Sequence, residues 1–448
     1  MKKILVILVL QYCTSSVKSQ VFNSSAITKT LDSITQQINS DPEQLISYRS
    51  LNKFFAKKVA YYLSGSSDLS LFTNYAVLDF GEDKATIGWN INASKKSSNR
   101  VSDVVTISLQ SAVMKNFAIL FADKNLNNDL GLNLKYTKIF KGSAWFDNKK
   151  QTQRIQAAGV PLTTQKAKMN LKRKLIVAEI NIELIKLAFH NVLYFQNLSR
   201  LEIPDSLIEQ EKEARFKILK TEAIDKYYAR ELEEMENEDN AVYKKAFSQW
   251  ISFKSFIPIT KSTFTGTADI TKTPSELVSR KWMFGASYSA IYESKRNKLF
   301  INGSAEIVKS NSIDASLIDE VSIDKFKLLS QNLDTSVFEK VNSESIYLGN
   351  YEEFWTPSIT AQVVFYPQFS KNVGIDLSFI KKFGKDQAFD FILGLPITLT
   401  SQDGDSPFNI ILQAKFRDIN NKILPEKSIS DKLQIGFKVG LPFNNIMK

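Results

Sequence analysis

The chain has 448 residues, of which 43% are hydrophobic, and a formal net charge of +11. Its lysines and arginines are scattered along the chain and are not gathered with aromatic residues on one face, so binding to nucleic acid is not expected. Cys13 is the only cysteine, which leaves no disulfide and no cysteine-ligated metal to predict.

The beginning of the chain has the layout of a secretory signal peptide. Lys2 and Lys3 precede the apolar run 4–10, and Ser19 offers a small residue at the cleavage site. The apolar run is too short to cross a bilayer, which takes about 20 residues, and no later run is long enough. We therefore expect residues 1–19 to be removed during export.

Residues 20–66 are predicted to form a helical segment. Asp41 and Pro42 can begin a helix, and Leu51, Phe54 and Phe55 recur at helical spacing. We expect this helix to be a small cap packed under the strands that follow. The alternative is a plug inside them.

Residues 67–146 alternate between apolar and polar side chains. Ile87, Trp89 and Ile91, for example, alternate with Gly88 and Asn90. Successive side chains of a strand point to opposite faces, so such a segment has one apolar face and one polar face. The pattern predicts five strands, and residues 117–123 are counted as one of them.

Residues 147–278 are expected to hold an inserted helical hairpin. Apolar residues recur every three or four positions between Leu171 and Val192, residues 203–206 break the pattern, and a second, more charged helix follows over 207–236. Each arm would be about 45 Å long at 1.5 Å per residue. Arms of this length can hold a partner protein, so a partner is expected on the helices of residues 165–236.

Strand alternation returns over residues 279–448, where seven more strands are predicted. At the end of the chain Leu433, Ile435 and Phe437 alternate with Gln434 and Gly436. Strands of this length with a polar inner face are typical of membrane barrels. The fold class is therefore mainly β with an α insertion: a twelve-stranded antiparallel transmembrane β-barrel with an inserted long helical hairpin. Fourteen strands result if residues 140–146 and 250–257 are both separate strands.

The strand number also predicts the side on which each loop lies. An even number puts both ends of the chain in the periplasm and the long loops outside. With twelve strands the helical hairpin then falls outside, and with fourteen it falls in the periplasm. Aromatic residues expected near the membrane interfaces are Trp89, Tyr136, Trp145, Trp282, Tyr292, Trp355 and Tyr366.

No residues for catalysis are recognisable. His190, the only histidine, lies in the middle of the first long helix without partners for catalysis or for a metal. Residues 123–129 resemble the start of a calcium loop, but they lack its glycine and its closing glutamate. We expect neither an enzyme nor a site for a cofactor or metal.

The polar faces of the strands provide the candidate site, because they should line the lumen of the barrel. These residues are Asn90, Asn92, Gln362, Asp376, Asp390, Asn409, Gln413, Lys415, Arg417, Gln434 and Lys438. They either satisfy one another inside a closed barrel or line a narrow passage, and both alternatives stay open.

The chain resembles exported outer-membrane proteins of Bacteroidota. The resemblance lies in a composition rich in Lys, Asn, Ile and Ser, in a short signal that ends at Ser19 before Gln20, and in turns rich in Lys and Asn. It implies an outer-membrane location with lipid around the barrel. The chain departs from many such barrels at its end, where residues 444–448 follow Phe443.

Three functions are compatible with these features. The favoured hypothesis is a membrane-anchored scaffold or interaction component that holds a protein through its helical hairpin. The first alternative is a porin-like channel for small polar solutes. The second is a soluble periplasmic β-rich binding protein, in which the apolar strand faces would pack against each other as a sandwich.

Overall fold

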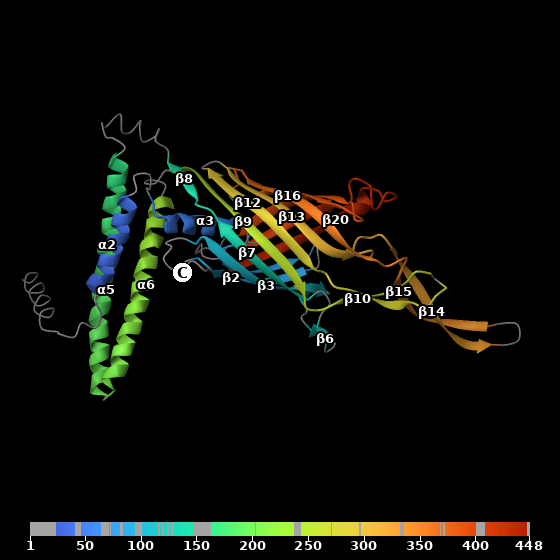
Figure 1. Ribbon diagram of the computed structural model, residues 1–448, viewed down its shortest axis with the longest axis horizontal. Helices are drawn as coiled ribbons and strands as arrows, with labels where there is room; N and C mark the ends of the chain where they lie inside the picture. Colours follow the sequence, from blue (N-terminus) through green and yellow to red (C-terminus); the bar gives the residue numbers. More distant parts are fainter. Residues whose placement is uncertain are drawn as a thin grey trace, which may run out of the picture. The chain divides into compact units, whose positions relative to one another are not determined.

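The computed structural model describes residues 24–40, 46–63, 71, 73–80, 84–94, 101–114, 117–118, 121–122, 125–126, 130–146, 163–201, 203–236, 243–269, 271–294, 297–331, 336–367, 369–370, 372–399 and 408–445 (Figure 1). The chain divides into two compact units. One comprises Met1–Lys53 and Phe146–Val242, and the other comprises Phe54–Trp145 and Tyr243–Lys448. The predicted signal peptide and the predicted helix start at Asp41 lie outside the described residues.

The first unit is helical. It contains α2 (Ser24–Ser40), α5 (Thr163–Arg200), α6 (Asp205–Glu236) and the beginning of α3 (Tyr48–Leu63). The helical hairpin predicted over residues 165–236 is confirmed, since α5 ends at Arg200 and α6 begins at Asp205. The three long helices share an apolar core of Ile27, Leu31, Ile38, Ile176, Val177, Ile180, Leu184, Phe195, Ile208, Ala223, Tyr227 and Tyr228.

The second unit is a closed antiparallel β-barrel of twelve strands, in the order β12-β13-β16-β17-β18-β19-β20-β1-β2-β3-β7-β9, and pairing of β9 with β12 closes it. The strands are β1 (Thr73–Asp79), β2 (Lys84–Asn92), β3 (Asp103–Met114), β7 (Gly131–Ile139), β9 (Tyr243–Pro258), β12 (Met283–Ser294), β13 (Lys298–Asn311), β16 (Glu353–Tyr366), β17 (Ile375–Lys382), β18 (Phe389–Leu399), β19 (Phe408–Phe416) and β20 (Leu433–Asn445). The predicted fold class is therefore confirmed.

Two of the individual strand predictions are wrong, although the total is right. The predicted strand 117–123 is no barrel strand: β4 (Phe117–Ala118) pairs only with β3, and β5 (Phe121–Ala122) pairs with β6 (Asn125–Leu126). The range 147–278 assigned to the helical hairpin contains the barrel strand β9. Four barrel strands therefore precede the helical insertion and eight follow it. A short strand, β8 (Ser143–Phe146), pairs with β9 outside the closed ring.

The two ends of the barrel differ in what they carry. Thr73 pairs with Asn445 at one end, which we call the terminal end. The chain also leaves β7 and enters β9 at this end, since Ile139 pairs with Trp250. The start of β1, the end of β20 and the two points at which the helical insertion joins the barrel strands therefore share one end. The prediction that the insertion leaves the barrel at the end opposite the first and last strand ends is wrong. The cause is the exchange of strand 117–123 for β9.

The opposite end, which we call the sheet end, carries a separate four-stranded sheet in the order β11-β10-β15-β14. It is made of β10 (Ser262–Thr267), β11 (Ser275–Ser279), β14 (Asp319–Gln331) and β15 (Ser336–Leu348). In Figure 1, β14 and β15 extend beyond the barrel strands. A 3-10 turn, η1 (Ser430–Lys432), precedes β20.

Candidate functional site

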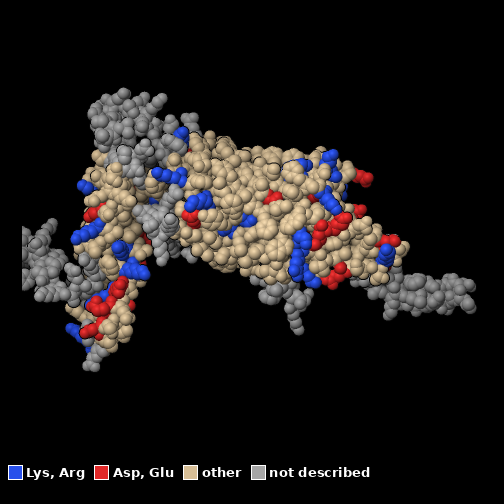
Figure 2. Space-filling view, in the orientation of Figure 1, with Lys and Arg blue, Asp and Glu red and all other residues tan. Residues whose placement is uncertain are grey.

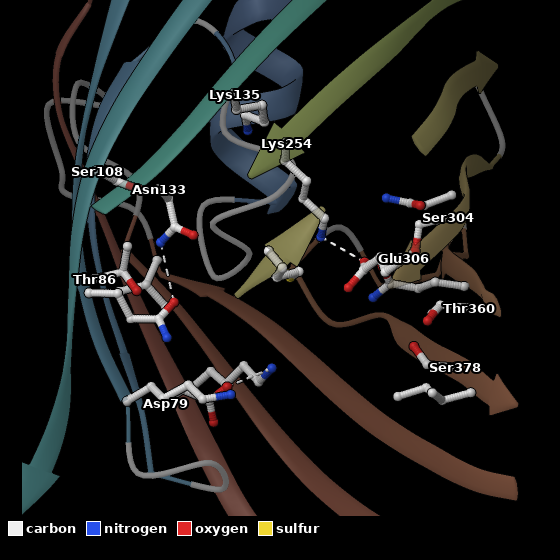
Figure 3. Close-up of a pocket in the computed structure, with 18 of the residues that line it drawn as sticks. Asp79, Thr86, Ser108, Asn133, Lys135, Lys254, Ser304, Glu306, Thr360 and Ser378 are labelled. Atoms are coloured by element: carbon white, nitrogen blue, oxygen red, sulfur yellow. Dashed lines mark hydrogen bonds and ion pairs between the residues drawn. The ribbon is translucent and has the colours of Figure 1, made fainter. Parts of the chain in front are cut away.

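A polar cavity of about 330 Å³ lies in the lumen of the barrel (Figure 3). Every one of the twelve barrel strands contributes to its wall, from Tyr75 on β1 to Lys438 on β20. The wall residues alternate along their strands with side chains that face outward, as a strand requires. Asp79, Gln110 and Lys254 lie toward the strand ends near the four-stranded sheet, so the cavity occupies the half of the lumen near the sheet end.

Charged side chains of the cavity wall form ion pairs across strands. Lys254 Nζ lies 2.8 Å from Glu306 Oε1, which also accepts a hydrogen bond of 3.1 Å from Ser304 Oγ. Lys438 Nζ lies 2.7 Å from Asp79 Oδ2. Figure 3 shows the first pair bridging β9 and β13 inside the barrel. Lys84 and Lys135 also line the cavity, so its wall holds four lysines and two carboxylates.

Three of the eleven predicted lumen residues line this cavity: Gln362, Gln413 and Lys438. Asp376 adjoins them, because Gln362 Nε2 donates hydrogen bonds of 3.0 and 2.9 Å to its two carboxylate oxygens. Asn90 is buried beside β3, where its side-chain oxygen accepts a hydrogen bond of 2.5 Å from Thr106 Oγ1. These contacts lie between neighbouring strands inside the barrel.

The remaining predicted residues lie away from the cavity. Asp390 is buried near the sheet end and accepts a hydrogen bond of 2.9 Å from the amide of Asp418, in the loop after β19. Arg417 also belongs to this loop and donates to Ser316 Oγ at 3.4 Å. Asn409 is buried near the terminal end of β19, and Lys415 is half-buried near the opposite end. Asn92 and Gln434 lie at strand ends and are exposed.

Five charged residues of the cavity were not predicted from the sequence: Asp79, Lys84, Lys135, Lys254 and Glu306. Glu306 alternates with Ala305 and Ile307, so the rule that identified the other lumen residues could have found it. Lys254 could not be found in this way, because its strand β9 was not recognised.

Large aromatic side chains are buried in the lumen near the terminal end, beside buried polar residues such as Ser289 and Glu293. Trp250 and Phe300 are buried and their ring centroids lie 5.9 Å apart, although β12 separates their strands. The second half of α3 belongs to the barrel unit, and its Phe54 and Phe55 are buried.

The packing of α3 against the barrel depends on Gly142, just after β7. A Cβ atom at this position would lie 2.6 Å from the ring of Phe55. The ring therefore rests directly on the backbone of Gly142. Phe55 therefore packs α3 against the segment that follows β7 at the terminal end, and both the cap and the plug stay predictions.

The outer wall of the barrel is apolar. Exposed side chains include Ile87, Trp89, Tyr136, Phe253, Phe284, Tyr292, Ile301, Trp355, Ile359, Leu393, Leu412 and Phe437. Most of the barrel wall in Figure 2 carries no charged side chain, whereas charged residues gather near the sheet end. An apolar belt of this extent is the surface of a barrel embedded in lipid. The sandwich required by the soluble binding protein is therefore wrong, because the apolar faces point outward.

Most of the aromatic residues expected at membrane interfaces are on this outer wall, as Trp89, Tyr136, Tyr292 and Trp355 are exposed. Tyr366 is an exception, since it is buried and faces inward. The side chain of Trp145 lies outside the described residues. Across the described residues, none of the helices has the length and apolarity that a membrane span requires.

His190 is exposed on α5. In the part of the chain that the structure describes, no three His, Cys, Asp or Glu residues are grouped so that they could hold a metal ion. Most of the calcium-like segment 123–129 lies outside the described residues.

No protein-family description matches the chain, and no curated protein is similar to it in sequence. Among solved structures, the crystal structure of the beta domain of the Bordetella autotransporter BrkA is similar at a TM-score of 0.28 and 6% sequence identity. The match covers 83% of this chain and 98% of that chain. The fold assignment above rests on the strand pairings of the chain itself.

Proposed function

We propose that this protein is an outer-membrane anchor whose barrel is closed and whose helical unit binds a partner protein. The observation that carries the proposal is the burial of Trp250 and Phe300 inside the lumen near the terminal end. The proposal takes α3, whose Phe55 ring packs on Gly142, as the plug that completes the closure. A filled lumen is no route for polar solutes, because water and ions avoid an apolar constriction. The functional surface then lies outside the barrel.

The helical unit supports this proposal. It has its own core of twelve buried residues, so its helices are held by one another. The outer membrane is the location that suits a closed antiparallel barrel with an apolar belt and an exported chain. The lipids of that membrane then surround the barrel.

The test has two parts. The mature chain is reconstituted into planar bilayers, and we expect no conductance steps. In parallel, affinity purification from native membranes compares the full chain with a variant in which residues 147–242 are replaced by a short turn. We expect partner proteins to be lost with the helices. Discrete open steps with the unaltered chain, or the same partners on both chains, would overturn the proposal.

The porin-like channel remains the second candidate, because the cavity is polar and all twelve strands contribute to its wall. In this case α3 would have to leave the lumen. Replacing Phe54 and Phe55 by serine weakens the apolar plug, so a channel that α3 gates should open more often in this double variant. If the double variant shows no more conductance than the unaltered barrel, the channel hypothesis is contradicted.

A further inference from the structure

Helix α5 carries a second apolar face that nothing in the described structure covers. Leu171, Leu175, Ala178, Ile182 and Ile185 are all exposed, the leucines and isoleucines by 49 to 60%. We call these five residues the α5 stripe. Leu193 is 52% exposed and continues the same face two turns further on. A helix advances about 1.5 Å per residue, so the face from Leu171 to Leu193 is about 33 Å long.

The α5 stripe lies opposite the face that packs into the helical unit. Ile176, Ile180 and Leu184 belong to the buried core and follow one another at intervals of four residues. A helix turns about 100° per residue, so these three residues point about 180° away from Leu171 and Ile182. The core therefore accounts for only one of the two apolar faces. Removal of these exposed leucine and isoleucine side chains from water is favourable, and this favours a partner on the second face.

The spacing of the α5 stripe identifies the shape of the partner. Its members are separated by four, three, four and three residues. This is the heptad spacing at which two helices pack side by side in a coiled coil. A helix lying on a membrane surface usually has a wider apolar face than this narrow seam. The pattern therefore fits another helix better than a lipid surface.

The charges beside the α5 stripe identify the chemistry of the partner. Lys174 and Lys186 are exposed and flank the stripe on its two sides, and neither forms an ion pair within the described part of the chain. The nearby carboxylates already have partners on α6: Arg230 Nη2 lies 3.0 Å from Glu183 Oε1, and Glu179 also pairs with Arg230. The charges beside the α5 stripe that have no ion-pair partner in the described part of the chain are therefore those of the two lysines, which are positive. A second copy of this chain would bring lysines together, whereas a helix with acidic flanks would complement them.

We propose that the α5 stripe is the docking surface for an amphipathic helix of a partner protein, with apolar residues at heptad spacing and glutamates or aspartates beside them. This inference rests on the proposed function and specifies which surface of the helical unit does the binding. The two can fail separately, because loss of partners on removing residues 147–242 does not depend on the α5 stripe.

The experiment uses the full chain in detergent and two synthetic helical peptides of about 28 residues, or four heptads, with leucine and isoleucine in the seam. One peptide has glutamates beside the seam and the other has lysines. Binding is measured by fluorescence anisotropy. We expect the glutamate peptide to bind, and Ile182→Glu to weaken its binding about tenfold or more.

Leu187→Glu is the matched control, since Leu187 is also on α5 and 44% exposed but lies off the α5 stripe. It should leave binding unchanged, and circular dichroism confirms that both variants keep their helices. The double variant Lys174→Glu and Lys186→Glu should exchange the preference, so that the lysine peptide binds better than the glutamate peptide.

Four results would overturn the proposal. They are equal binding of the two peptides, equal loss of binding in the Ile182 and Leu187 variants, a dimer of this chain that Ile182→Glu abolishes, and binding to anionic lipid vesicles that the same substitution abolishes. The third would assign the α5 stripe to a second copy of the chain, and the fourth would assign it to lipid.

Discussion

The side chain of Glu231 on α6 is the most heavily hydrogen-bonded carboxylate of the helical unit. Its Oε1 accepts from Arg173 Nε at 2.8 Å, and its Oε2 accepts from Ser47 Oγ at 2.5 Å and from Ser50 Oγ at 2.7 Å. The side chains of Arg173 and Glu231 are both 0% exposed. This cluster joins α5, α6 and the beginning of α3. A buried pair is tolerated only where such additional bonds satisfy it.

Replacing Glu231 by alanine should therefore be strongly destabilising, because it leaves the guanidinium of Arg173 buried without its carboxylate. We expect a loss of roughly 3–5 kcal/mol from the helical unit. The measurement is urea unfolding of the full chain followed by the helical signal in circular dichroism. The double variant Arg173→Met and Glu231→Met is the control, since it removes both charges and should recover much of the stability. A single variant as stable as the unaltered chain would contradict this account.

Asp418, in the loop 417–432 near the sheet end, is also a carboxylate that accepts several hydrogen bonds. Its carboxylate accepts backbone hydrogen bonds of 2.9, 2.9 and 2.7 Å from Lys422, Ile423 and Leu424. Lys432 Nζ lies 3.6 Å from Oδ2 of the same carboxylate. Burial raises the pKa of Asp418, but the three amides and the charge of Lys432 outweigh burial and lower the pKa below its usual value.

This lowered pKa gives the loop a defined dependence on pH. A carboxylate with a lowered pKa in the folded state contributes its stabilisation above the unfolded pKa of about 3.9, and the stabilisation is lost as pH falls through the folded value. Hydrogen exchange of residues 417–432 should thus stay slow near neutral pH and report opening of the loop below about pH 4. Asp418→Asn should open the loop more at neutral pH and respond less to acid. An unchanged loop in this variant would show that the carboxylate does not hold it.

At the scale of elements, alternation of apolar and polar residues was enough to predict a strand wherever one face of the strand meets lipid and the other carries polar side chains. Leu393 and Leu395 on β18 face outward, while Asp390 and Thr398 face inward and are buried. This is why the last strands were predicted correctly. The pattern also indicated inward positions for Gln362, Gln413 and Lys438, which all line the cavity.

Strand β9 was not predicted from the sequence, and the reason is physical. Its inward residues Trp250 and Phe256 are apolar because they fill the lumen, and its outward residue Phe253 is apolar because it faces lipid. With apolar side chains on both faces the alternation disappears. The cavity likewise depends on contacts between strands that are distant in sequence, such as Lys254 with Glu306, and periodicity along one strand cannot reveal those contacts.

Neighbouring barrel strands also contact each other through aromatic rings that lie over glycines. A Cβ atom on Gly131 of β7 would lie 2.0 Å from the ring of Phe256 on β9, whereas one on Gly303 of β13 would meet nothing within 4 Å. Gly131→Val should therefore push the ring aside and cost about 1–3 kcal/mol.

The measurement for this prediction is the temperature at which the folded, faster-migrating band on a gel converts to the unfolded one. Gly131→Val should lower this temperature. Gly303→Val is the matched control, since it adds the same side chain to a strand of the same barrel without a neighbour to displace, and it should leave the temperature unchanged. Equal effects at the two positions would show that the contact between Gly131 and Phe256 is unimportant.

At the scale of the whole molecule, the chain combines two units with separate cores. The barrel is closed by β9 and β12 through twelve paired residues, and its ring of strands contains no residue of the helical insertion. Strands β7 and β9 are neighbours in the ring, and Ile139 pairs with Trp250 where the insertion begins. A short turn can therefore replace residues 147–242 without changing the order of the barrel strands.

We expect the chain shortened in this way, with an Asn-Gly turn between Phe146 and Tyr243, to form a heat-modifiable barrel in detergent. It should also remain silent in planar bilayers, because Phe54, Phe55, Trp250 and Phe300 are all retained and belong to the barrel unit. Loss of the folded band would mean that the barrel needs the helices to close. A folded barrel that conducts would mean instead that Phe54, Phe55, Trp250 and Phe300 do not by themselves close the lumen.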